Sequence, residues 1–293
     1  MKKLLLILMA YTATNTLFAQ TDSTQNNTDT IKVGNYIILK NNKSADNDSS
    51  VSKKNKKQVN IDIRIGENNS KNKNKNKNLS TNWWIFDLGF ANYRDETNYT
   101  TAQAGSYFQA NAGTPKVDAN GMNLINNKSS NVNIWVFMQK LNLAKHKLNL
   151  KYGLGIEMYN FRFERSTSYR KDPINYVFND DVKFSKNKLY AGYLTIPLML
   201  NFTPNPDNKK SLSFSAGVSA GYLLNARNKQ ISSERGKQKI RSNFDLEPFR
   251  VAAVAEIGLG PIKLYGSYSL NALHKSSTGI QQYPFALGVR FSN

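Results

Sequence analysis

"LNLKYGLGIEMYN", residues 148–160, alternates apolar side chains with polar or small ones from end to end. Because successive side chains of a strand point to opposite faces, the stretch predicts a strand with one apolar face and one face of glycine, amide and charged groups. In a soluble barrel the apolar face points inward and the charges meet water. In a membrane barrel the apolar face meets lipid and the polar face fills the interior. Which of the two faces meets water therefore decides whether the protein is a soluble barrel or a membrane barrel.

Seven other stretches have a strand-like pattern, which brings the number of predicted strands to eight. They are residues 81–93, 131–143, 188–203, 211–224, 248–259, 262–271 and 283–291. Both faces of residues 131–143 are fairly apolar, so the sequence leaves open which of them points inward.

The connections between these strands alternate in length. Those at residues 94–130, 165–187 and 225–243 are long, the turns between them are short, and the last, at residues 272–281, is intermediate. Long outer loops that alternate with short periplasmic turns are typical of outer-membrane barrels. We therefore predict an all-β fold, an eight-stranded antiparallel up-and-down transmembrane β-barrel with a disordered N-terminal extension.

The polar face carries charges of both signs in nearly equal number. They are Asp87, Lys151, Glu157, Arg250, Glu256, Lys263 and Arg290. A narrow interior must pair such charges, because an unpaired buried ion is costly. We expect a charge network inside the barrel, in which a tight hairpin at Gly260 and Pro261 places Glu256 opposite Lys263. The alternative is an ordinary solvated strand face of a soluble sandwich.

The apolar face carries aromatic rings toward its ends and aliphatic side chains between them. The predicted aromatic girdle comprises Trp84, Phe202, Phe214, Tyr222, Phe249, Tyr268, Tyr283 and Phe291. Rings at both membrane interfaces are typical of outer-membrane barrels. The pattern therefore predicts that the apolar face meets lipid and that the wet side is inside.

The N-terminal region has a different composition. Residues 1–19 have the parts of a secretory signal peptide, with two lysines, an apolar run and a cleavage site after Ala19. Residues 20–80 are rich in Asn, Lys and Ser and predict a flexible periplasmic extension and linker that contains two short alternating pieces, at 30–40 and 59–66. Residues 81–293 form the predicted barrel. We expect an outer-membrane location with both termini in the periplasm.

The formal net charge is +20, and the chain has no cysteine. An exported protein rarely meets nucleic acid, so we expect outer-membrane lipid and lipopolysaccharide as the anionic partners and no nucleic acid. The loop "ARNKQISSERGKQKIR", residues 226–241, supplies six bases against the single acid Glu234: Arg227, Lys229, Arg235, Lys237, Lys239 and Arg241. This loop either contacts lipopolysaccharide phosphates or is merely solvated.

Catalytic and cofactor motifs are scarce. The two histidines, His146 and His274, lie in predicted connections and have no carboxylate nearby in sequence to orient them. No metal-ligand spacing, P-loop or Rossmann signature occurs, so we expect no cofactor, no metal and no catalytic residue. His274 is interpreted as a solvated loop residue. An eight-stranded interior filled with side chains is also too narrow for a water channel.

The chain resembles the PorT-like outer-membrane β-barrel proteins of Bacteroidota. The resemblance is carried by "TDTIKVGN", "NWWIFDLGFANY", "KLNLKYGLGIEMYNFRF", "YLTIPLML", "AGVSAGYLL" and the terminal "YPFALGVRF". It implies an eight-stranded outer-membrane barrel and says little about activity, although one member is linked to protein secretion and gliding.

The favoured function is a non-enzymatic structural, adhesion or partner-docking role. Three alternatives stay open. The first is an accessory of a secretion or gliding assembly, whose periplasmic partner pairs with residues 59–66 by strand addition. The second is a lipid-modifying enzyme, and the third is a soluble lipocalin-like carrier.

Overall fold

The computed structural model describes residues 28–33, 36–41, 62–64, 77–111, 113–208 and 211–292, and it divides into two units, Met1–Asn74 and Lys75–Asn293. The first unit contains a three-stranded antiparallel sheet in the order β1 (Thr28–Val33), β2 (Tyr36–Asn41) and β3 (Asp62–Arg64). The predicted signal peptide lies outside the described residues. No helix within the described ranges is long and apolar enough to cross a membrane.

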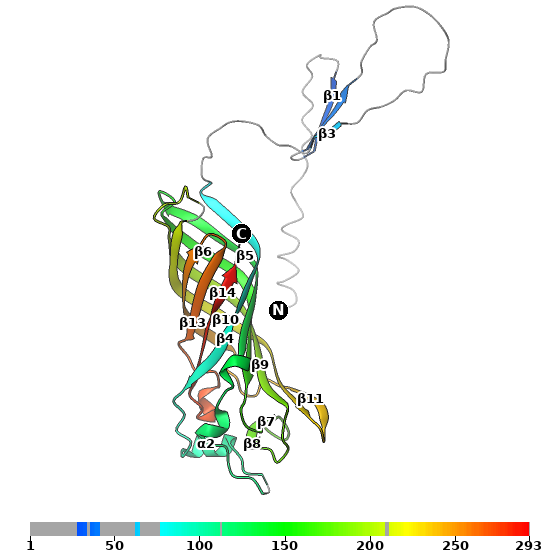
Figure 1. Ribbon diagram of the computed structural model, residues 1–293, viewed down its shortest axis with the longest axis vertical. Helices are drawn as coiled ribbons and strands as arrows, with labels where there is room; N and C mark the ends of the chain where they lie inside the picture. Colours follow the sequence, from blue (N-terminus) through cyan, green and yellow to red (C-terminus); the bar gives the residue numbers. More distant parts are fainter. Residues whose placement is uncertain are drawn as a thin grey trace, which may run out of the picture. The chain divides into compact units, whose positions relative to one another are not determined.

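Eight strands of the second unit close into an antiparallel barrel (Figure 1). They are β4 (Leu79–Asp95), β5 (Ser130–Ala144), β6 (Leu148–Arg162), β9 (Lys186–Phe202), β10 (Leu212–Ser232), β12 (Phe249–Leu259), β13 (Ile262–Ser269) and β14 (Gln282–Phe291). Each strand pairs with its neighbours in the sequence, and β14 pairs with β4 to complete the circle. The predicted eight-stranded up-and-down barrel is confirmed.

A bulge in β5 explains why the faces of that strand could not be assigned from the sequence. The pairing of β5 with β6 shifts by one residue between Trp135 and Phe137. Asn131, Asn133 and Trp135 are buried before the bulge, and Met138 is buried after it. One extra residue moves the following side chains to the opposite face. Apolar residues therefore occupy odd and even positions of one strand while a single face points inward.

The two strands β9 and β10 continue well beyond the apolar part of the barrel. β11 (Gly236–Arg241) folds back on β10, pairing with Arg227–Ser232, and β9 pairs with the same segment on its other side. The prediction that residues 225–243 form a loop is therefore wrong for most of this segment. No apolar period marks it, because the side chains that point inward there, such as Asn228 and Gln230, are polar.

The four connections at the end opposite the short turns pack together into a folded cover, the loop cap. Besides β11, its elements are α2 (Ala102–Tyr107), η1 (Ala119–Met122), η2 (Asn126–Lys128), β7 (Thr167–Arg170), β8 (Tyr176–Asn179) and η3 (Ser276–Thr278). Each connection contributes buried apolar side chains to one cluster, among them Phe108, Val177, Phe244 and Leu273. This cluster continues into the mouth of the barrel through Tyr159 and Tyr193.

The outward face of the barrel is an apolar band. On β12, every second residue from Phe249 to Leu259 is exposed and apolar. The 11 residues of this strand, at ~3.3 Å per residue and a tilt of about 40°, give a band roughly 25 Å tall, the height expected of a transmembrane barrel. Exposed leucines and isoleucines continue it on β9, where Leu194, Ile196, Leu198 and Leu200 are 40–55% exposed.

Candidate functional site

Arg290 is the centre of the charge network inside the barrel. Its Nε and Nη2 atoms donate to the two carboxylate oxygens of Asp87 at 2.6 and 2.7 Å, and its Nη1 atom pairs with Glu256. Asp87, which is fully buried, also accepts hydrogen bonds from the Trp135 indole at 2.7 Å and from Asn133 at 3.0 Å. The guanidinium lies over the Trp135 ring, 5.0 Å from its centroid. Both carboxylate oxygens of Asp87 thus accept hydrogen bonds, as a buried carboxylate requires.

The position of Glu256 corrects one expectation. Its side chain pairs with Lys151 and Arg290, whereas Lys263 donates to the hydroxyl of Ser292. The hairpin at Gly260 and Pro261 pairs Leu259 with Ile262, so Glu256 lies opposite Tyr265 and Lys263 lies opposite Gly258. The predicted Glu256–Lys263 pair is therefore wrong, because the two-residue turn sets Lys263 two positions away from the residue facing Glu256.

A second group of buried charges lies closer to the loop cap. The Nη1 atom of Arg250 donates to Glu157 at 2.7 Å, Nη2 donates to the Tyr159 hydroxyl at 2.6 Å, and Nε donates to Ser269 at 2.8 Å. Arg250 and Glu157 are both less than 5% exposed. The structure thus brings all seven predicted interior charges into a polar core, six of them in ion pairs.

Little free space remains in this interior. Two cavities among the ion pairs, one beside Glu157 and Ser219 and one beside Lys140 and Lys263, have volumes of about 10 Å³ each. Such a volume holds about one water molecule. Side chains, and above them the loop cap, therefore fill the barrel.

The predicted girdle residues lie at both edges of the apolar band. All of them are exposed except Tyr283, which is half-buried. Phe202 and Phe214 are direct cross-strand neighbours at the turn end, and Tyr222 and Phe249 are neighbours at the loop end with ring centroids 5.3 Å apart. Their contact with lipid headgroups remains a prediction.

The bases of the predicted lipopolysaccharide-contacting loop separate into two sets. Arg227, Lys229, Lys237, Lys239 and Arg241 share the outward face of the β10–β11 hairpin, because their cross-strand register pairs odd positions with odd positions. Arg235 belongs to a different environment. It donates to both carboxylate oxygens of Asp180 at 2.9 and 3.0 Å and to Asp181 at 3.3 Å.

Asp180 anchors a pocket of about 490 Å³ between β8, β10 and β11. Its carboxylate also accepts from Ser168 at 3.0 Å and pairs with Arg170 at 3.4 Å. Burial acts to raise the pKa of the Asp180 carboxyl, but its hydrogen bonds with Asp181, Val182, Arg235 and Ser168 outweigh burial, so the pKa lies below its ordinary value. Arg235 therefore has carboxylate partners within the protein, which sets it apart from the other five bases of this segment.

His274 is buried in the loop cap, so its interpretation as a solvated loop residue is wrong. The imidazole is 1% exposed and stacks on the Tyr169 ring at 6.1 Å between centroids, with Tyr107 edge-on at 5.9 Å. Neither ring nitrogen has a hydrogen-bond partner in the described protein. Burial lowers the pKa of His274 to about 3. The sequence could not predict this position, because the cap forms between connections far apart in the chain.

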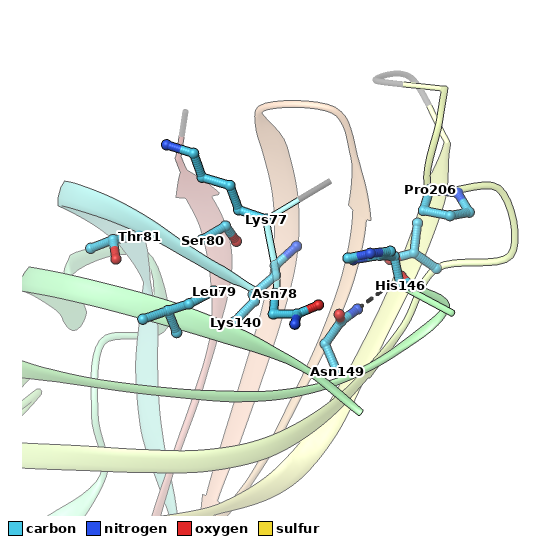
Figure 2. A pocket seen from close by; sticks show the side chains of 10 residues that line it. Lys77, Asn78, Leu79, Ser80, Thr81, Lys140, His146, Asn149 and Pro206 are labelled. Carbon is cyan, nitrogen blue, oxygen red and sulfur yellow. Dashed lines mark hydrogen bonds between the residues drawn. The ribbon is translucent and has the colours of Figure 1, made fainter. Parts of the chain in front are cut away.

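At the turn end, strand ends surround an open pocket of about 570 Å³ (Figure 2). The first residues of β4, where the chain enters the barrel, line it together with Lys140, His146, Asn149 and Pro206. Asn149 donates to the carbonyl of His146 at 3.2 Å, which holds the β5–β6 turn. In the parts of the chain that the structure describes, no group of three or more His, Cys, Asp and Glu residues is arranged to hold a metal ion.

Sequence reasoning missed several residues at these sites. Trp135 and Asn133, the partners of Asp87, were hidden by the bulge in β5. Arg162, Lys186 and Lys188 share the outward face with the bases of β10 and β11 through the register of β6, β9 and β10. A signal for part of this set is present in the sequence: at the loop ends of β9 and β10, every second residue is a base.

Comparison with protein families agrees with this architecture. The family described as outer membrane protein beta-barrel domain matches residues 18–277. Among solved structures, Ail, the attachment invasion locus protein of Yersinia pestis, is 10% identical over 73% of this chain and 98% of that chain, with a TM-score of 0.29. A TM-score this low supports no structural or functional argument. The comparison with curated proteins found no match. The family match covers most of the chain, which therefore belongs to the outer-membrane β-barrel proteins of that domain family.

Proposed function

We propose that the protein is a non-enzymatic component of the outer membrane that presents the loop cap as a contact surface outside the cell. The observation that carries this proposal is the sealed barrel, in which paired charges leave cavities of only about 10 Å³ and a folded cap covers the mouth. A filled barrel does not conduct solutes, so its functional parts are its surfaces. Folded loops on a rigid scaffold are common sites of recognition.

Replacing one connection of the cap tests this role. Residues 97–128 are exchanged for a short glycine–serine turn, and the variant is checked for heat-modifiable migration from the outer-membrane fraction. We expect an inserted barrel that has lost adhesion to neighbouring cells or cross-linking to surface partners. Adhesion and cross-linking equal to those of the wild type in an inserted barrel would contradict the proposal. The matched control replaces the turn at residues 204–210, at the opposite end of the barrel.

The enzymatic alternative makes a different prediction for His274. Because this imidazole is buried between Tyr107 and Tyr169, it is not accessible to a lipid substrate. We expect the mass spectrum of lipid A to be the same in cells that carry the wild type and the His274→Ala variant. A changed acylation or phosphorylation pattern would favour the lipid-modifying enzyme.

A second candidate function is that of an accessory in a secretion or gliding assembly, as the PorT-like resemblance implies. The observation in its favour is the small sheet of the N-terminal unit, in which β3 lies at an edge. An edge strand offers unpaired backbone groups for strand addition by a partner. Deletion of residues 20–80 is then expected to abolish the assembly while the barrel still inserts. An intact assembly in the deletion strain would rule out this role.

A further inference from the structure

A row of like charges crosses four neighbouring strands just beyond the apolar band. Arg162 of β6 lies opposite Lys188 of β9, Lys188 lies opposite Lys229 of β10, and Lys229 lies opposite Lys239 of β11. Directly opposed residues of antiparallel strands have Cβ atoms roughly 5 Å apart and point to the same face. Four strands at ~4.8 Å spacing place these four bases along a line of roughly 14 Å.

Further bases extend this row on both sides. Arg227 and Arg241 face each other one step nearer the membrane, and Lys186 and Lys237 flank Ile231 one step farther from it. We call the whole set the basic ladder: Arg162, Lys186, Lys188, Arg227, Lys229, Lys237, Lys239 and Arg241.

The ladder lies on the outside of the barrel. On β6, β9 and β10, the alternating residues Phe161, Leu189, Asn228 and Gln230 are each less than 4% exposed and point inward. On β11, Ile240 packs against the core of the loop cap, so Lys239 on the other face points away from it. The ladder therefore faces the medium around the barrel and not the apolar core of the cap.

No carboxylate in the described parts of the chain pairs with a base of the ladder. Arg227 lies over the ring of Tyr190 at 4.3 Å, and its Nε atom is buried without a hydrogen-bond partner in the described protein. Like charges placed directly opposite each other on a sheet are destabilising. An external anion would relieve this repulsion.

The height of the ladder identifies the source of that anion. Tyr222 and Leu224 are the last large apolar residues of β10 that are strongly exposed, at 51% and 48%, and Arg227 follows them. Tyrosine rings mark the interface between hydrocarbon and headgroups. Bases one to three residue pairs beyond that interface are therefore level with the headgroups of the lipid leaflet that surrounds the loop end of the barrel.

We propose that the basic ladder binds the phosphate groups of lipopolysaccharide in the outer leaflet. Lysine and arginine form short charge-assisted hydrogen bonds with phosphate oxygens. A row of bases roughly 14 Å long across four strands is long enough to contact more than one phosphate of a glycolipid headgroup. The ladder includes Arg162, Lys186 and Lys188 on β6 and β9 and excludes Arg235, which Asp180 holds. This inference rests on the outer-membrane placement of the proposed function but not on any partner of the loop cap.

The test uses the full-length chain refolded in nonionic detergent and fluorescent lipopolysaccharide as the probe. The Lys188→Gln/Lys229→Gln/Lys239→Gln variant removes the centre of the ladder. At about a factor of five in affinity per base near a charged surface, we expect affinity to fall on the order of 100-fold. The Lys188→Arg/Lys229→Arg/Lys239→Arg variant keeps the charge and is expected to bind like the wild type.

Two controls make the result specific. The Lys128→Gln/Lys145→Gln/Lys147→Gln variant removes the same charge elsewhere and is expected to bind as the wild type does. Dephosphorylated lipopolysaccharide is expected to bind the wild type as weakly as the intact glycolipid binds the ladder variant. Equal losses in the ladder and control variants, or equal binding of both glycolipids, would overturn the proposal.

Heat-modifiable migration verifies that each variant is folded. If the triple variant does not fold, the single Lys229→Gln variant replaces it, with an expected loss of about fivefold. An unchanged affinity in that variant also overturns the proposal. Loss of lipopolysaccharide binding with normal adhesion, or the reverse, separates this site from the role of the loop cap.

Discussion

The charged residues inside the barrel form ion pairs, whereas those of the basic ladder do not. Inside, each carboxylate has a cationic partner and six of the seven predicted charges form ion pairs. On the outer face, the eight bases of the ladder have no ion-pair partner among the described residues. A buried ion can be stabilised only by the protein, whereas an outward-facing ion is stabilised by solvent or by a ligand. The ion pairs inside the barrel therefore stabilise the fold, whereas the unpaired bases of the ladder are candidates for binding an external anion.

The largest effect is expected at Arg290. The Arg290→Met substitution leaves Asp87 and Glu256 without their shared cation, so we expect the free energy of unfolding to fall by about 3–5 kcal/mol. Urea titration of the refolded protein, followed by the loss of heat-modifiable migration, measures this change. The matched control is Arg94→Met, because Arg94 is exposed and pairs only with Glu96 at the surface. A loss below about 1 kcal/mol at Arg290 would show that the interior is hydrated enough to solvate its ions.

The second pair sharpens the comparison through a double-mutant cycle. Arg250→Met alone leaves the carboxylate of Glu157 without its cation, and we expect a loss of about 3 kcal/mol. Combined with Glu157→Leu, the loss is expected to shrink by at least ~1 kcal/mol, since no charge is then left unpaired. The same urea titration measures all three variants. Strictly additive losses would mean that Arg250 acts through Tyr159 and Ser269 and not through Glu157.

The loop cap is expected to weaken in acid because of His274. Burial lowers the pKa of this imidazole from 6.5 to about 3. Between these two values the unfolded cap binds a proton that the folded cap excludes, so the contribution to stability is complete above pH 6.5, decreases as the pH falls, and is lost by pH 3. At about pH 5 the loss is roughly 2 kcal/mol.

Hydrogen exchange of residues 97–129 and 270–281, corrected for intrinsic rates, measures this acid sensitivity. The His274→Phe variant preserves a ring beside Tyr169 and cannot be protonated, so it serves as the control and is expected to lack the pH dependence. Equal protection of the wild type at pH 7 and pH 5 would contradict the burial of a neutral imidazole.

The smallest effect has the opposite sign and belongs to the basic ladder. Without lipopolysaccharide, Lys229→Gln relieves repulsion from Lys188 and Lys239, so we expect stability to rise by about 0.2–1 kcal/mol at low salt. The gain is expected to vanish at about 1 M salt, where charges are screened beyond ~3 Å. Urea titration at the two salt concentrations measures it, with Lys128→Gln as the control. A loss of stability would mean that Lys229 has a structural partner.

The comparison also shows how much of this protein can be predicted from its sequence. Strand number, the inward and outward faces of every barrel strand except β5, and the membership of the interior network follow from a period of two, because lipid outside and paired charge inside allow few alternatives. The partners within the network do not follow. Asp87 meets Asn133 and Trp135 through the β4–β5 register, which the apolar pattern does not specify, and Glu256 misses Lys263 because of the length of one turn.

The loop regions were predicted least well. The continuation of β10 to Ser232 carries no apolar period, since its inward residues Asn228 and Gln230 form hydrogen bonds with polar side chains of the neighbouring elements. His274 is buried by segments more than 90 residues away in sequence, such as that of Tyr169. Neither is a local property of the chain. The members of the ladder can be predicted only in part, because three of its bases lie on strands whose register the sequence does not specify.

The pairing of β14 with β4 has a consequence for the synthesis and membrane insertion of the protein. These two strands are nearly 200 positions apart, and ten residue pairs join them, from Gln282 with Asp95 to Phe291 with Phe86. Until β14 has been synthesised and exported, both β4 and β13 have open backbone edges that lipid cannot satisfy. Insertion therefore depends on β14, and a ribosome that stops before this strand produces a protein that cannot enter the bilayer as a closed barrel.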